Sequence, residues 1–91
     1  MKIKQLLATE KNWCKGSFAQ DAQGNTVSSH ETTATAWCLV GAARQCYPEL
    51  ERSFILRQIK EARSMRDVGT WNDAPERTFE EVKRLVEALD V

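Results

Sequence analysis

No charged side chain occurs between Thr32 and Ala43, although charged residues make up 29% of the chain. A helix that is apolar on nearly every side is a buried helix. The run therefore predicts a buried helix over residues 31–45, with Ser28 or Ser29 as its N-cap. In a chain of 91 residues, such a helix would be the central element of the fold.

Small residues occupy one side of this predicted helix. Ala34, Cys38, Gly41 and Ala42 form this side, and Trp37 lies beside it. A glycine inside a helix costs ~1 kcal/mol relative to alanine. We therefore expect Gly41 to permit the close approach of another backbone or of a ligand.

The other elements follow from periodicity and turn chemistry. Apolar spacing predicts an N-terminal helix of about ten residues, a helix over 48–65, and a last helix that begins at the capping box Thr78-Phe79-Glu80-Glu81. Asp, Gly and Asn crowded into residues 21–25 predict a β-hairpin with its tip near Gln23-Gly24. Residues 67–75 are rich in Gly, Asn, Asp and Pro, which predicts a loop.

The predicted order is helix, hairpin, helix, helix, helix. This order indicates an α+β fold that is mostly helical, with about four helices and one β-hairpin inserted after the first helix. No linker or repeat divides the chain, so we expect a single domain over residues 1–91.

Composition argues against several classes of protein. The 13 Lys and Arg residues balance the 13 Asp and Glu residues, and a net charge of zero disfavours binding to nucleic acid or anionic lipid. No apolar run approaches the ~20 residues of a membrane helix, and the N-terminus lacks the apolar stretch of a signal peptide. Three cysteines, an odd number, are typical of reduced thiols. We expect a cytoplasmic protein without a membrane partner.

Each of the three tryptophans adjoins a thiol or a small polar residue, twice in a Trp-Cys pair. A binding interpretation is a pocket walled by indoles, with polar groups that contact a ligand. The candidate ligand-binding residues are Trp37, Cys38, Trp71, Asn72, Asp73 and Arg77. A structural interpretation stays open, in which Trp13 and Trp37 are core and Trp71 holds a loop against the body of the protein. In that interpretation Asn72 or Asp73 bonds backbone amides of the turn, and Asp73 pairs with Arg77.

The predicted helix over 48–65 offers a second candidate surface. Its apolar arc consists of Leu50, Phe54, Ile55, Ile59, Ala62 and Met65. On the opposite side, Leu56 stands among Arg52, Lys60 and Arg63. An apolar side chain in a basic setting predicts a contact with an acidic protein or with a second copy of the chain. The alternative is an ordinary solvated helix face.

The spacing of the cysteines argues against a metal site. Cys38 and Cys46 lie eight positions apart on one predicted helix, roughly 12 Å along its axis. Two thiolates that share a zinc ion must lie within roughly 4 Å, so we predict no metal site, and no cofactor motif is present. A thiol enzyme that uses Cys14 or Cys38 with His30 or Asp73 stays open as an alternative.

Two strings resemble a known family. They are Trp37-Cys38-Leu39-Val40-Gly41-Ala42 and the segment Trp71-Asn72-Asp73-Ala74-Pro75-Glu76-Arg77-Thr78. With the aromatic and turn segment from Trp13 to Val27, they resemble a family of small bacterial and phage proteins of unknown function, over roughly residues 10–90. The resemblance implies that the residues of both strings belong to one recurring arrangement. A phage setting would favour an accessory or host-antagonising role.

The leading hypothesis is a small non-enzymatic binding module for a protein partner or a small ligand. Its candidate sites are the segment 71–77 and the face formed by Arg52, Leu56, Lys60 and Arg63. The alternatives are the thiol enzyme and a structural subunit that self-associates.

Overall fold

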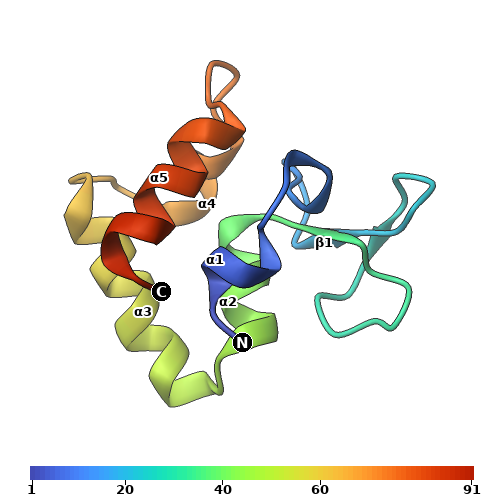
Figure 1. Ribbon diagram of the computed structural model, residues 1–91, viewed down its shortest axis with the longest axis horizontal. Coiled ribbons are helices and arrows are strands. Elements are labelled where there is room, and N and C mark those ends of the chain that lie inside the picture. The colour runs from blue at the N-terminus through green and yellow to red at the C-terminus, as the bar shows by residue number, and fades with distance from the viewer.

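The computed structural model describes residues 1–91 and has an α+β fold (Figure 1). In chain order its elements are α1 (Ile3–Leu6), the 3-10 helix η1 (Glu10–Asn12), β1 (Ala19–Gln20), β2 (Thr26–Val27), β3 (Ala36–Trp37), α2 (Leu39–Cys46), α3 (Glu49–Ala62), α4 (Val68–Asp73) and α5 (Phe79–Leu89). The expected α+β class is therefore confirmed. The expected N-terminal helix of about ten residues is wrong, because α1 ends at Leu6 and η1 follows it.

The hairpin lies where turn chemistry placed it. Strands β1 and β2 pair antiparallel, with Ala19 opposite Val27. The Asp21 carboxylate accepts hydrogen bonds from the backbone N–H groups of Gln23 and Asn25, and Gly24 has a φ of +84°, which closes the turn. Strand β3 pairs antiparallel with the other edge of β1, so the sheet order is β2-β1-β3.

The buried helix expected over residues 31–45 is wrong in its first half, residues 31–38, which are not helical. The threonines of this segment, Thr32, Thr33 and Thr35, are exposed in a connection, and the next two residues form β3. Helix α2 begins only at Leu39, so neither Ser28 nor Ser29 caps it. The cap is Cys38, whose Sγ accepts a hydrogen bond from the Gly41 N–H at 3.3 Å. Pairing with β1 fixes an extended backbone at β3, and the helix starts after that backbone ends.

The close approach expected at Gly41 is confirmed. A Cβ atom added to Gly41 would lie 1.8 Å from the carbonyl oxygen of Phe18. The same oxygen accepts a hydrogen bond from the Cys38 N–H at 3.2 Å. The backbone before β1 therefore packs directly on the first turn of α2, at a point where only glycine fits.

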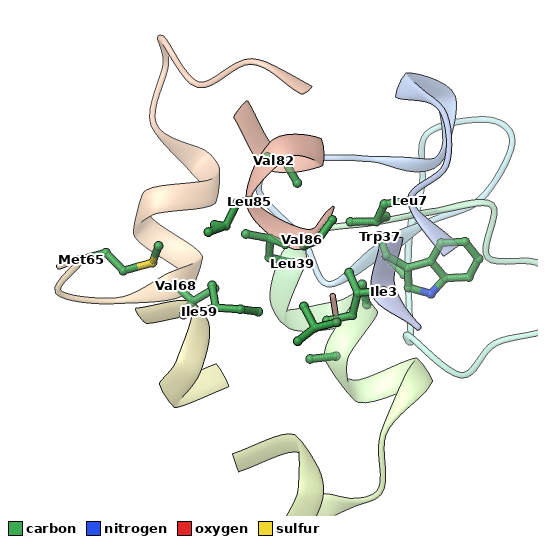
Figure 2. Packing of buried hydrophobic residues seen from close by; sticks show 14 residues of the cluster. Ile3, Leu7, Trp37, Leu39, Ile59, Met65, Val68, Val82, Leu85 and Val86 are labelled. Atoms are coloured by element: carbon green, nitrogen blue, oxygen red, sulfur yellow. The ribbon is translucent and has the colours of Figure 1, made fainter. Parts of the chain in front are cut away.

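The core lies where α1, α2, α3 and α5 meet, and the chain ends contribute to it (Figure 2). Ile3, Leu39, Ile59, Leu85 and Val86 are fully buried there. The two termini lie side by side, because the Ile3 N–H donates to the carbonyl oxygen of Val91 at 2.5 Å. None of the helices has the length and apolar character that a membrane span requires.

Helix α3 departs from its expected arc at its N-terminal end. Ile59 is buried and Ile55 half-buried, but Leu50 and Phe54 are 76% and 63% exposed. The first turns of α3 project away from α5 (Figure 1), so the core does not reach them. Leu56, expected to be exposed, is half-buried and packs against the core cluster.

The loop expected over residues 67–75 is also wrong. Most of its residues, Val68–Asp73, form α4, which the Asp67 carboxylate caps by accepting from the Thr70 N–H at 2.8 Å. The expected capping box of α5 is confirmed. Thr78 Oγ1 accepts from the Glu81 N–H, and the Glu81 carboxylate accepts from the Thr78 N–H in return.

Candidate functional site

Asn72 on α4 joins three distant segments. Its Oδ1 accepts hydrogen bonds from the Trp13 indole N–H at 2.7 Å and from the Leu39 N–H at 3.1 Å. Its Nδ2 donates to the Cys14 carbonyl oxygen at 3.1 Å and to Asp73 Oδ1 at 2.9 Å. The side chain is fully buried, and these four bonds use its whole hydrogen-bonding capacity. Asn72 is therefore a positioning residue, with no group left for a ligand.

Asp73 and the residues after it hold the segment that follows Trp13. Asp73 Oδ1 accepts a second hydrogen bond, from the Gly16 N–H at 3.0 Å. The Lys15 ammonium donates to the Ala74 carbonyl oxygen at 2.8 Å and lies 5.5 Å from the centre of the Trp13 ring. The end of α4 and residues 13–16 thus form one clasp. Asp73 Oδ2 accepts no hydrogen bond from the protein.

The expected Asp73–Arg77 pair does not form. The Arg77 guanidinium instead lies 3.8 Å from the centre of the Trp71 ring and donates to the Trp71 carbonyl oxygen at 2.8 Å. It also pairs with Glu81, one turn into α5, at 2.8 Å. A cation just before a helix N-terminus is slightly unfavourable, and here the Glu81 carboxylate and the Trp71 ring offset this effect. Arg77 therefore fixes the connection between α4 and α5.

The structure does not gather the three tryptophans into one pocket. Trp13 packs against Phe79 with ring centres 6.2 Å apart, and Trp37 is buried with its N–H donating to the Ser29 carbonyl oxygen. Trp71 is half-buried beneath Arg77. Each indole has a separate partner, although a backbone bridge joins Trp13 to Trp37.

A surface hollow of about 350 Å³ lies between the hairpin, α2 and α4. We call it the Asp73 hollow; its lining residues are Gly16, Ser17, Phe18, Thr26, Val27, Cys38, Val40, Gly69 and Asp73. Its walls are mostly apolar, and Asp73 is its one charged residue. The Phe18 ring stays 48% exposed, with the Arg44 guanidinium 4.9 Å from its centre.

Two of the six residues predicted to bind a ligand, Cys38 and Asp73, line this hollow. Sequence reasoning missed Phe18, Val27 and Val40, which form its apolar walls. One signal pointed to the neighbourhood. The glycine requirement at Gly41 showed that another backbone approaches α2, but it did not identify that backbone as the segment ending in Phe18.

The thiols lie in surroundings that disfavour the thiolate. Burial, with a smaller contribution from the neighbouring Cys38, raises the pKa of Cys14 to about 11. Burial also raises the pKa of Cys38, although hydrogen bonds from the first turn of α2 oppose the shift. His30 is bonded to Gln45 through Nδ1 at 3.0 Å, while the Cys14 thiol donates to the Ser17 carbonyl oxygen. The structure therefore gives neither thiol a histidine partner.

The basic face of α3 is arranged differently from the sequence-based expectation. Leu56 and Lys60 border a groove of about 290 Å³, whereas Arg52 and Arg63 do not. We call this the basic groove; its lining residues are Val40, Leu56, Arg57, Lys60, Arg66, Asp67 and Val68. Arg63 is the exposed C-cap of α3, and the Nε of Arg52 is buried without a hydrogen-bond partner. No group of three or more His, Cys, Asp or Glu residues is placed to hold a metal ion.

Comparison with known families supplies one match. The model of a family of unknown function, DUF6197, matches residues 2–89, which is nearly the whole chain. Neither the curated proteins nor the solved structures contain a match to this chain. The expected likeness to a family of unknown function is confirmed by the extent of the match. The chain therefore belongs to the family of unknown function DUF6197.

Proposed function

We propose that this protein is a non-enzymatic binding module whose Asp73 hollow takes an apolar group with a positively charged head. The proposal depends on one observation, that a carboxylate lies beside the apolar walls of the hollow. Phe18, Val27 and Val40 offer apolar surface, and one carboxylate oxygen beside them has no donor within the protein. A carboxylate next to apolar walls favours an ammonium or guanidinium group that carries an alkyl or aryl body.

The clasp supports this proposal because it fixes Asp73 before a ligand arrives. Asp73 Oδ1 is held by the Gly16 N–H and by Asn72, and Asn72 is itself held by three other groups. A carboxylate that is already oriented loses little conformational entropy on binding. In this proposal the two neighbouring residues have different roles. Asn72 positions the Asp73 carboxylate, and Asp73 contacts the charged head of the ligand.

The cysteines favour binding over thiol catalysis. A nucleophilic cysteine needs a lowered pKa or an adjacent base. The pKa of Cys14 is instead raised to about 11 by burial, and that of Cys38 is raised for the same reason. Within the hollow, Cys38 contributes apolar surface and caps α2 through its sulfur.

The test is an NMR titration of the ¹⁵N-labelled protein with benzylammonium, and with benzyl alcohol and benzoate as neutral and anionic controls. We expect saturable shifts of the amide signals of Gly16, Val40 and Gly69 with benzylammonium. Benzyl alcohol should bind more weakly and benzoate not at all. Absence of saturable shifts at these amides, or equal responses to all three compounds, would overturn the proposal.

The matched variant is Asp73→Asn, which keeps an oxygen acceptor for the Gly16 N–H and removes the charge. A charge-assisted hydrogen bond contributes ~1.5–3 kcal/mol, so the affinity for benzylammonium should fall by about 10- to 100-fold. The control is Asp21→Asn, which removes a carboxylate from the hairpin turn outside the hollow. It should leave the affinity unchanged, and an equal loss in both variants would mean that only net charge matters.

A second candidate function is self-association through α3. Leu50 and Phe54 lie one turn apart and are 76% and 63% exposed, so together they form an apolar patch. Sedimentation equilibrium should then give a mass above the monomer that Phe54→Glu returns to the monomer. Arg63→Glu, on the same helix and outside the patch, is the control. A monomeric wild-type protein at high concentration would rule this candidate out.

A further inference from the structure

The basic groove collects positive charge that the fold leaves unpaired. Arg57 and Lys60 come from α3, and Arg66 comes from the turn that leads to α4. None of the three forms an ion pair. The ion pairs of the structure use other cations, namely Lys2, Lys4, Arg77 and Arg84.

The groove has one carboxylate, Asp67, and one of its two oxygens is already used inside the protein. Asp67 Oδ2 accepts hydrogen bonds from both the N–H and the Oγ1 of Thr70 at 2.8 Å, in its role as the N-cap of α4. These hydrogen bonds from Thr70, with a smaller contribution from the Lys60 ammonium, hold the pKa of Asp67 below its ordinary value. Three cations thus face one carboxylate in a chain whose net charge is zero. Their mutual repulsion is relieved if an anion binds among them.

The floor of the groove is apolar. Val68 is buried and Val40 and Leu56 are half-buried, whereas the three cations are exposed, and Leu56 also packs against the core cluster. A site with an apolar floor and a cationic rim matches an apolar side chain flanked by carboxylates. Nucleic acid fits less well, because no aromatic ring lines the groove for a base to stack on.

We propose that the basic groove is a docking site for an acidic segment of a protein partner. In this arrangement an apolar side chain of the partner covers Leu56 and Val68, and its Asp or Glu carboxylates pair with Arg57, Lys60 and Arg66. Each guanidinium group can donate two parallel hydrogen bonds to one carboxylate, which fixes the orientation of the segment. Val40 also borders the Asp73 hollow, so the two sites are neighbours of opposite charge.

The test is fluorescence anisotropy with a short labelled peptide of alternating Glu and Leu, titrated with the intact protein. Control peptides replace every Glu by Gln, or every Leu by Ser, and a labelled single-stranded oligonucleotide represents nucleic acid. We expect saturable binding of the Glu/Leu peptide that weakens as salt is added and is lost with either control peptide. No binding of the Glu/Leu peptide, or tighter binding of the oligonucleotide, would overturn the proposal.

The variants locate the binding on the groove. Arg57→Gln combined with Lys60→Gln should weaken binding of the peptide by at least about tenfold, since two charge contacts are lost. Arg63→Gln combined with Arg84→Gln removes the same number of charges outside the groove and should change binding by less than about twofold. Equal losses in the two double variants would contradict a site in the groove. Melting curves of both variants confirm that each remains folded.

The outcome is separable from that of the Asp73 hollow. Asp73→Asn should leave the affinity for the peptide unchanged, because Asp73 does not line the groove. The groove variants should likewise bind benzylammonium as the wild-type protein does. A failure of one proposal therefore leaves the other standing.

Discussion

The indole of Trp13 donates a hydrogen bond of 2.7 Å to the side chain of Asn72, across 59 positions of the sequence. Because Asn72 also accepts from the Leu39 N–H, its removal leaves two donors without partners. Each buried donor without a partner costs ~1–3 kcal/mol. We predict that Asn72→Ala lowers the free energy of unfolding by about 2–6 kcal/mol, measured by urea denaturation.

The comparison variant for this prediction is Trp13→Phe. It keeps an aromatic ring against Phe79 and removes one donor only, so the loss should be about 1 kcal/mol. A change of less than about 0.5 kcal/mol in Asn72→Ala would mean that the clasp contributes nothing to stability.

Gly41 gives a second prediction. Gly41→Ala would place a methyl group 1.8 Å from the Phe18 carbonyl oxygen, a backbone atom that can move only with β1. We expect a loss of at least about 1–3 kcal/mol, seen as a lower melting temperature. Gly69→Ala is the matched control, because its nearest new contact is an Asp67 oxygen at 3.4 Å. The control should be neutral, or more stable by up to about 1 kcal/mol. Similar melting temperatures for the two variants would show that the backbone before β1 does not pack closely against α2 at Gly41.

The thiols give a third prediction. With a pKa of about 11, Cys14 carries a thiolate in only about one molecule in ten thousand at pH 7. Iodoacetamide should therefore modify Cys14 and Cys38 slowly in the native protein and all three cysteines quickly in urea. Cys46, which is half-buried at the end of α2, should react first. Peptide mapping by mass spectrometry gives the order. Rapid modification of Cys14 or Cys38 at pH 7 would support the thiol enzyme instead.

The chain ends give a fourth prediction, on pH. Hydrogen bonds and ion pairs from Lys4 and Lys2 lower the pKa of Asp90 from 3.8 to about 2. A lowered pKa in the folded state contributes stability above pH 3.8, and this contribution is lost as the pH falls toward 2. Asp90→Asn keeps a residue that tolerates the left-handed backbone found here, with φ of 56°.

The melting temperature of Asp90→Asn should therefore lie below that of the wild-type protein at neutral pH. The difference should shrink between about pH 4 and pH 2 and vanish below that range. Calorimetry across this range measures it. A difference that stays constant down to pH 2 would show that the pKa of Asp90 is not lowered.

The elements set by local chemistry were predictable from the sequence. The hairpin turn is determined by Asp21 and Gly24, and the start of α5 by Thr78 and Glu81. Each of these features depends on contacts within a few residues, which a sequence displays directly. The close packing at Gly41 was predictable for a related reason, because a glycine in a helix requires an explanation.

The errors arose where distant contacts override local preference. Gly69, Asn72 and Asp73 are typical of a loop, yet α4 forms because Asp67 caps it and Asn72 bonds to α2 and the segment at Trp13. The lack of charge before Trp37 predicted a buried helix, but pairing with β1 draws the backbone into β3. Strand pairing of this kind cannot be read from periodicity in either partner alone.

The candidate site was predictable in part for the same reason. Asp73 and Cys38 were identified because they stand in the two tryptophan strings. The apolar walls at Phe18, Val27 and Val40 come from three different elements or connections, which only the folded chain brings together. Most residues of the string that begins at Trp71 have structural roles, and Asp73 is the one that lines the hollow.

Intermolecular NOEs in an NMR sample saturated with benzylammonium would show directly whether the probe binds in the Asp73 hollow. We predict NOEs from the aromatic protons of the probe to the methyl groups of Val27 and Val40 and to the ring of Phe18. These NOEs should disappear in Asp73→Asn at the same concentration of probe. NOEs to Leu50 and Phe54 on α3, with none to the hollow, would contradict the claim that the Asp73 hollow is the binding site.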